Sequence, residues 1–394
     1  MFVQRLKLEH FRRFDELDLS FTHRLNVIVG VNGAGKSTIL GAIAKMLSWY
    51  VRRLVSPSGT GVGVPILESE IKMGAASASI EVSVSDGVKD VAWVLQKNVK
   101  GAPVASARSE LRALNDYVKE FRENRRGDIR SVPIIVSYGV NRSVVDIPLR
   151  IRQRHQFSVL SAYDYVFERS ADFRRFFEWF RANEDIENER IADRVVEGRG
   201  EGSEYRHSRE LPAVRQALSV FLPEFTKWKI RRTPLRMEVL KDGHPLNVEQ
   251  LSDGEKCIVA LVGDLARRLV VANPDFENPL VGSGVVLIDE VELHLHPAWQ
   301  RTILPRLLKT FPNVQFIVTT HSPTVLAQLN ALLYGQEDSG IGVYELRDGR
   351  ISSMIDSETG LIISGEMDDV VQAIDSEFDA LLNGSENENK SDAQ

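Results

Sequence analysis

The order of hydrophobic and polar positions predicts strands and helices that follow one another along the chain. Apolar residues alternate with polar ones in residues 3–8 and 17–21, which indicates two paired strands. The β-branched run at 24–29 predicts a buried strand, and apolar residues with helical spacing in 37–50 predict a helix. A glycine-rich loop lies between them, so the chain begins with the order strand, loop and helix.

Similar patterns continue through the rest of the chain. Two antiparallel strands, a charged helix and a buried strand are predicted at 79–84, 88–96, 109–125 and 133–138. In the last third, helices alternate with apolar strands at 252–272, 284–288, 297–311 and 314–319. Strands that alternate with helices indicate an α/β fold, in which a mixed or parallel sheet is flanked by helices. The paired strands near the N-terminus add an antiparallel part.

The region between these two parts has a different composition. Residues 158–221 are rich in arginine, glutamate and aromatic side chains at helical spacing, which predicts an inserted helical subdomain. The aromatic residues at 173–180 favour a helix core over a platform for stacking bases. We therefore predict an N-terminal lobe at 1–148, a helical insert at 149–235, a C-terminal lobe at 236–382 and a disordered tail at 383–394.

Composition excludes several classes of protein. The chain has 394 residues and is 43% hydrophobic, which allows a large core. No apolar stretch reaches the roughly 18 residues of a membrane span, and the first residues lack the apolar segment of a signal peptide. The single cysteine, Cys257, excludes an internal disulfide. We therefore expect a cytoplasmic protein without membrane contact.

Charge leaves one question open. The formal net charge of -6 argues against indiscriminate binding of nucleic acid, but arginines gather in residues 122–154. This basic segment predicts either a solvated surface or a contact with DNA or RNA.

The glycine-rich loop carries the strongest chemical signal. Residues 30–37 satisfy the pattern G-x-x-x-x-G-K-S, with a strand before it and a helix after it. Backbone N–H groups of such a Walker A loop surround phosphate oxygens, the lysine reaches the outer phosphates, and the serine binds Mg²⁺. The pattern therefore predicts an Mg-ATP site, with Ser37 as a metal ligand. The predicted nucleotide contacts are Asn32, Gly33, Ala34, Gly35, Lys36, Ser37 and Thr38.

A second motif supplies carboxylates to the same site. The apolar strand at 285–288 ends in Asp289 and Glu290. This arrangement predicts that Asp289 lies beside the metal bound by Ser37 and that Glu290 orients or deprotonates the attacking water.

Two further motifs follow the pattern of a nucleotide switch. Ser252, Gly254 and Glu255 open a predicted helix with capping-box spacing, and a helix start of this kind also binds anions. Because the Walker A helix already holds one nucleotide, the second helix start is expected to serve a nucleotide on another subunit. His321 follows the apolar strand at 314–319, where it is a candidate sensor of the γ-phosphate.

The four motifs in this order resemble the ABC-ATPase heads of the SMC and RecF superfamily. The resemblance implies two heads that enclose two ATP molecules, with each signature helix contacting the γ-phosphate on the opposing Walker A loop. It also implies that the early basic turn with Arg12 and Arg13 contacts nucleotide. Asp253 departs from the family pattern, which has glycine or a small residue there. The glutamine of the usual Q-loop is not evident, because Asn141 and Arg142 follow the strand at 133–138.

Residues 177–180, 251–274 and 293–301 narrow the resemblance to a bacterial group of stand-alone ATPases. This group includes anti-phage ATPases similar to PtuA of Septu systems and has also been labelled as virulence-associated. The resemblance implies a homodimer or higher homo-oligomer that regulates a separate effector, an HNH-type nuclease. The main alternative is a RecF-like DNA-binding ATPase in repair, while a transporter subunit or a small-molecule kinase fits the motifs less well.

The turn at 291–297 replaces the ordinary D-loop of transporters. Glu292, His294 and His296 could bind a metal ion there, but the sequence favours structural or dimer contacts for them.

Overall fold

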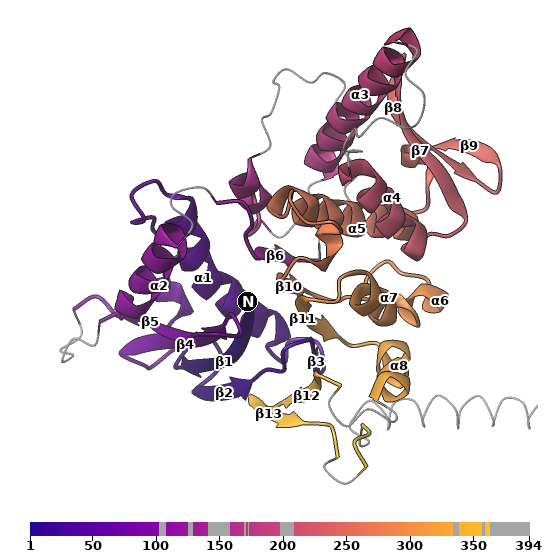
Figure 1. The fold of residues 1–394 in the computed structure, drawn as a ribbon. Coiled ribbons are helices and arrows are strands. Elements are labelled where there is room, and N and C mark those ends of the chain that lie inside the picture. The colour runs from indigo at the N-terminus through magenta and orange to yellow at the C-terminus, as the bar shows by residue number, and fades with distance from the viewer. Residues whose placement is uncertain are drawn as a thin grey trace, which may run out of the picture.

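The computed structural model describes residues 1–101, 108–124, 129–140, 158–168, 171, 173–197, 209–333, 339–356 and 359–362. A six-stranded mixed sheet lies at its centre (Figure 1). Five of its strands are parallel, and the edge strand β13 is antiparallel to its neighbour. In spatial order the strands are β13 (Arg350–Ser353), β12 (Ile341–Arg347), β3 (Leu25–Val29), β11 (Val314–Thr320), β10 (Gly284–Ile288) and β6 (Ile134–Tyr138).

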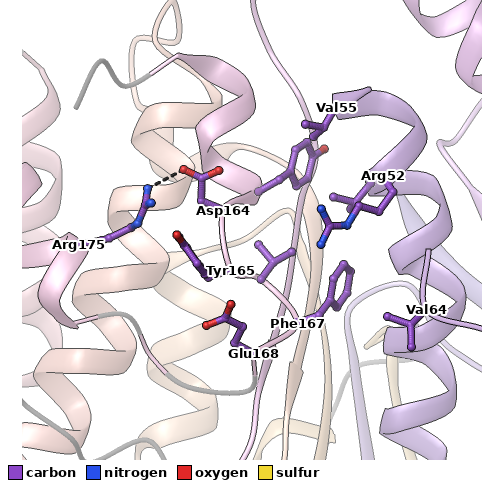
Figure 2. A pocket seen from close by; sticks show the side chains of 11 residues that line it. Arg52, Val55, Val64, Asp164, Tyr165, Phe167, Glu168 and Arg175 are labelled. Atoms are coloured by element: carbon purple, nitrogen blue, oxygen red, sulfur yellow. Dashed lines mark hydrogen bonds and ion pairs between the residues drawn. The ribbon is translucent and has the colours of Figure 1, made fainter. Parts of the chain in front are cut away.

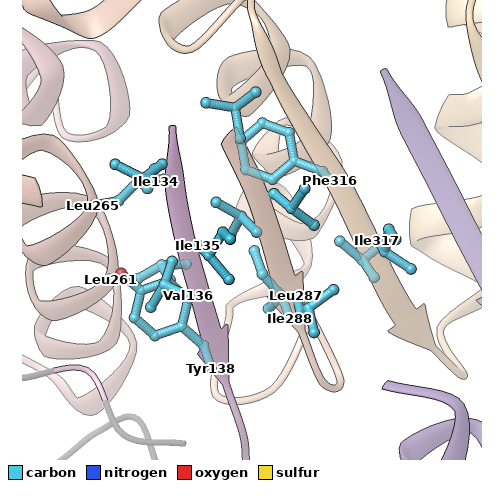
Figure 3. Close-up of a cluster of buried hydrophobic side chains, with 14 of the residues drawn as sticks. Ile134, Ile135, Val136, Tyr138, Leu261, Leu265, Leu287, Ile288, Phe316 and Ile317 are labelled. Carbon is cyan, nitrogen blue, oxygen red and sulfur yellow. The ribbon is translucent and has the colours of Figure 1, made fainter. Parts of the chain in front are cut away.

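Hydrophobic runs explain why these strands are central. Every residue of β3, β6, β10 and β11 is buried, as expected for strands covered on both faces. Helix α5 (Asp253–Ala272) packs against β6, and Figure 3 shows its Leu265 beside Ile134 and its Leu261 beside Val136 of that strand. Helix α1 (Lys36–Val55) contacts β6, β10 and β11, and also the antiparallel sheet described below.

The N-terminal strands form a second sheet, which is antiparallel throughout. Its order is β2 (Glu16–Ser20), β1 (Phe2–Glu9), β4 (Ser77–Ser85) and β5 (Asp90–Asn98). Helix α2 (Arg112–Glu123) packs on β5, and Gln315 of β11 exchanges hydrogen bonds with the backbone of Val3 at 2.7 and 2.8 Å. The predicted α/β fold, with its mixed sheet and N-terminal antiparallel strands, is confirmed.

Two helices and a third sheet lie on the side of α5 that faces away from the central sheet. They are α3 (Phe173–Glu197), α4 (Glu210–Phe221), β7 (Phe225–Arg232), β8 (Leu235–Lys241) and β9 (His244–Asn247). Phe173, Phe176 and Trp179 of α3 are at most 1% exposed, so these aromatic residues are core, as predicted. The predicted boundary after residue 235 falls at the start of β8, which pairs with β7 in one sheet. The division of the chain into domains stays a prediction.

One predicted helix was wrong. The continuous helix expected at 297–311 is divided into α6 (Pro297–Gln300) and α7 (Ile303–Thr310), because the backbone of Thr302 leaves the helical region at φ -123°. The remaining elements are α8 (Pro323–Leu333) and the short 3-10 turns Glu68–Glu70, Val159–Tyr163, Val248–Gln250 and Pro279–Val281. Within the described ranges, none of the helices has both the length and the hydrophobicity that crossing a bilayer requires.

Several predictions fall on residues outside the described part of the chain. Asn141, Arg142, most arginines of the basic segment and the predicted tail at 383–394 belong to them.

A buried ionic cluster ties α5 to the end of β6. Asp264 accepts hydrogen bonds from Arg267 at 2.6 Å, Arg268 at 2.7 Å and the hydroxyl of Tyr138 at 2.9 Å. The side chains of Asp264, Arg267 and Arg268 are 0% exposed. Burial works to raise the pKa of Asp264, but Arg268 and Arg267 hold this pKa below its ordinary value. Arg268 also donates to the backbone oxygens of Ala162 and Asp164, at 2.6 and 3.0 Å.

Candidate functional site

The carboxyl edge of the six-stranded sheet brings three of the four motifs together. In the parallel register, Val29 of β3 lies opposite Thr320 of β11, and Val318 lies opposite Ile288 of β10. The next residues on these strands begin the Walker A loop, the segment with His321 and the segment with Asp289. Such an edge is where open α/β sheets bind ligands.

The Walker A loop depends on its glycines. Gly30, Gly33 and Gly35 have φ values of 152°, 79° and 113°, which side chains with a Cβ rarely adopt. A Cβ on Gly30 would also lie 2.5 Å from the backbone oxygen of Leu346 in β12. Helix α1 starts at Lys36 without a side-chain cap, so its first N–H groups remain available to an anion.

Lys36 is the cation of this loop. Its Nζ donates to the backbone oxygens of Gly30 and Val31, the latter at 3.1 Å. Burial lowers the pKa of Lys36, and the negative charges of Glu290, Glu292 and Asp289 oppose this effect. A buried cation beside a glycine loop fits the phosphates of ATP.

The other predicted loop contacts differ in exposure. Asn32, Gly33 and Ser37 are exposed, Gly35 and Thr38 are half-buried, and Ala34 is buried. An exposed Ser37 hydroxyl at the start of α1 can serve as the predicted Mg²⁺ ligand.

The two arginines of the early turn take different positions. Arg13 donates to the backbone oxygen of Gly33, and a Cβ on Gly35 would lie 2.8 Å from Cδ of Arg13. Arg12 instead donates from Nη2 to Oε1 of Glu70 at 2.9 Å. The turn therefore covers the Walker A loop through Arg13, while Arg12 is tied to Glu70.

Thr319 links the two carboxylate residues that follow β10. Its Oγ1 donates to Oδ1 of Asp289 at 2.6 Å and accepts from the backbone N–H of Glu290 at 2.8 Å. Glu290 has φ 48°, an uncommon conformation for a residue with a side chain. The sequence analysis did not predict that Thr319 holds these two residues. The polar residues Thr319 and Thr320 at the end of an otherwise apolar strand were a signal for it.

His321 pairs with an acidic residue from the turn after β10. Oε1 of Glu292 accepts from the backbone N–H of His321 at 2.8 Å and lies 3.0 Å from its Nδ1. His296 caps α6, because its Nδ1 accepts from the N–H of Ala298 at 3.2 Å. Within the described residues, no group of three or more histidine, cysteine or acidic side chains could hold a metal ion. Glu292 and His296 thus each accept a hydrogen bond from a backbone N–H group.

The signature residues lie on a separate helix start. Ser252 caps α5 in the predicted capping box: its N–H and hydroxyl donate to Oε2 of Glu255 at 2.7 and 2.8 Å. Gly254 packs against the turn after β10, where an added Cβ would lie 2.7 Å from the backbone oxygen of His294. Ser252 and Asp253 remain exposed on the outside of this contact.

A cavity of about 510 Å³ lies elsewhere, beside the C-terminal half of α1 (Figure 2). Arg52, Tyr165, Phe167 and Arg175 are among its lining residues, and Arg175 pairs with Asp164 at 2.6 Å. At the rise of a helix, Arg52 is about 24 Å along α1 from Lys36. None of the predicted nucleotide-binding residues lines this cavity.

The comparisons with known proteins agree with these motifs. The family described as "AAA domain, putative AbiEii toxin, Type IV TA system" matches residues 25–327. The chain belongs to this family. It is 34% identical over 377 residues to the retron Ec83 probable ATPase of Escherichia coli, a match that covers 82% of this chain and 69% of the relative. It is therefore an ATPase that binds nucleotide.

Two further relatives support the predicted resemblance. The retron Vc95 probable ATPase of Vibrio cholerae is 30% identical over 372 residues, covering 84% of this chain and 72% of the relative. The Septu protein PtuA of Bacillus mycoides is 36% identical over 118 residues, covering 30% of this chain and 16% of PtuA. Among solved structures, the SMC head domain from Thermotoga maritima has a TM-score of 0.45 and 15% identity, covering 93% of this chain and 100% of that domain. The predicted similarity to bacterial ATPases that include PtuA is confirmed by these relatives.

Proposed function

We propose that this chain binds Mg-ATP between the Walker A loop of one copy and the signature helix of a second copy. One observation carries the proposal. The sheet edge gathers Lys36, Asp289 and His321, whereas Ser252 and Asp253 lie exposed at the start of a different helix. A capped helix start with exposed polar residues is suited to an anion, and a second copy can supply one. Each copy then contributes half of two sites.

Each site residue has a defined role in this proposal. Lys36 and the N–H groups of the Walker A loop hold the phosphates, Ser37 and Asp289 bind Mg²⁺, and Arg13 with Arg12 approaches the nucleotide. Bound Mg²⁺ supplies neutralisation of phosphate charge. Glu290 orients or deprotonates water, and His321 contacts the γ-phosphate. Ser252, Gly254 and Glu255 present the helix start to the nucleotide of the other copy.

The biological role that we propose is anti-phage defence. Retron and Septu ATPases are among the relatives of this chain. By analogy, the dimer or a higher homo-oligomer acts in the cytoplasm, regulates a separate effector, an HNH-type nuclease, and contacts DNA or RNA. The ATP state would determine whether the effector is held or released.

Glu290→Gln tests the proposed site. We expect ATP hydrolysis to fall about a hundredfold or more, because the general base is lost. ATP binding should persist, and light scattering should show twice the protomer mass when ATP is present. Lys36→Ala is the control and should keep its nucleotide-free mass.

An unchanged mass of Glu290→Gln on ATP addition would contradict the shared site. Salt-dependent DNA binding by the isolated chain would instead support the RecF-like alternative, because phosphate contacts release counterions.

A further inference from the structure

Glu292 holds both the backbone and the ring of His321. Its Oε1 accepts from the His321 N–H at 2.8 Å and lies 3.0 Å from Nδ1 of the imidazole. The Glu292 side chain is 5% exposed, while that of His321 is 45% exposed. A buried carboxylate on a turn that starts from the sheet therefore fixes an otherwise exposed ring.

This contact determines which imidazole nitrogen is available to a ligand. A ring nitrogen that faces a carboxylate carries the proton, so the neutral imidazole of His321 has Nδ1–H. Within the described residues, Glu292 is the only polar side chain paired with this ring. Nε2 is therefore the nitrogen left free to meet a ligand.

The position of Glu292 connects it to the nucleotide site. It lies two residues beyond Glu290 in the chain. Burial lowers the pKa of Lys36, and the negative charge of Glu292 is one of those that oppose this lowering. Its second oxygen, Oε2, is buried and accepts no hydrogen bond from the described residues. One oxygen of Glu292 is thus engaged by His321, and the other has no hydrogen-bond partner among the described residues.

We propose that Glu292 is a positioning residue for ATP hydrolysis, which holds His321 with Nδ1–H toward the turn and Nε2 toward the terminal phosphate. This inference rests on the proposed function, in which His321 contacts the γ-phosphate. Glu292 acts through His321 and does not touch the nucleotide. Its role therefore differs from that of Glu290, which acts on water.

A double-mutant cycle tests the proposal with Glu292→Gln, His321→Gln and the double variant in the full chain. We expect Glu292→Gln to lower kcat by about tenfold to a hundredfold, as for other residues that orient a functional histidine, with KM for ATP nearly unchanged. Because both residues act as one unit, the double variant should lose no more activity than His321→Gln alone. Glu292→Asp keeps the charge and should recover part of kcat.

Two measurements separate positioning from a merely structural role. The first is a comparison with Glu277→Gln, a matched control that changes an exposed glutamate. If Glu292 only positions His321, the two variants should have the same melting temperature and the same affinity for ATP. The second is the tautomer of the His321 ring, measured by ¹⁵N NMR at alkaline pH. The wild type should carry the proton on Nδ1, and Glu292→Gln should shift it toward Nε2. The His321→Gln spectrum assigns the signal.

Wild-type kcat in Glu292→Gln, losses that multiply in the double variant, or an unchanged tautomer would each overturn the proposal. Wild-type kcat in His321→Gln has a different meaning, because it would contradict the role of His321 in the proposed function itself.

Discussion

Two polar regions of this protein lie at the central sheet and differ in their exposure to solvent. In the ionic cluster of Asp264, Arg267 and Arg268, both carboxylate oxygens are used and the side chains are fully buried. At the carboxyl edge of the sheet, Ser37 and His321 are exposed and Oε2 of Glu292 has no partner among the described residues. The cluster is shielded from solvent, whereas the edge presents exposed polar groups to a ligand.

The difference separates stability from chemistry. A buried ion pair is costly to break, since the remaining charge has no solvent. An edge with exposed polar groups and a strained Glu290 at φ 48° contributes less to stability and gains from ligand contacts. Substitutions in the cluster should therefore change unfolding, and those at the edge should change turnover.

Asp264→Asn should give the largest effect on stability. We expect a loss of about 3 to 5 kcal/mol, because two buried arginines lose their carboxylate. Tyr138→Phe removes one hydrogen bond of the same cluster and should cost about 1 kcal/mol. Urea unfolding measured without ATP checks both values, with the exposed Asp275→Asn as the control.

Asp264→Asn should also change the stability of the protein in acid. The folded pKa of Asp264 is below its ordinary value, so its contribution is present above the unfolded pKa of about 3.9 and is lost as pH falls through the lower folded pKa. Acidification below about pH 4 should destabilise the wild type more than Asp264→Asn. Equal acid sensitivity of the two proteins would contradict the described cluster.

Thr319→Val tests the edge and should give a smaller effect. The change keeps the shape but removes the hydroxyl that holds Asp289 and the Glu290 backbone. Loss of about 1.4 kcal/mol of hydrogen bonding in the transition state would lower kcat about tenfold. Thr310→Val is a matched control, because the Thr310 hydroxyl is buried without a hydrogen-bond partner in the described residues. A similar kcat for the two variants would contradict the role of Thr319.

Local patterns predicted much of this architecture. Apolar runs identified β3, β10 and β11, and the spacing of Ser252 and Glu255 predicted the capping box of α5. The order of the Walker A loop and Asp289 after buried strands predicted that both reach one edge, because parallel strands end together.

Long-range pairing could not be predicted in the same way. Glu292 meets His321 only because β10 and β11 pair in a particular register, which periodicity does not specify. The same applies to Thr319 and to the choice between Arg12 and Arg13, since Glu70 lies 58 residues beyond Arg12. These contacts depend on how the sheets pack against each other, so only the three-dimensional structure reveals them.

The shared nucleotide site is the central claim, and mixing two inactive variants tests it most directly. Lys36→Ala removes the Walker A cation, and Ser252→Arg blocks the signature helix start, so neither variant should hydrolyse ATP alone. In an equal mixture about half of the dimers are mixed and each has one intact site, so we expect about a quarter of wild-type activity. An inactive mixture that contains mixed dimers would contradict a site shared between two copies.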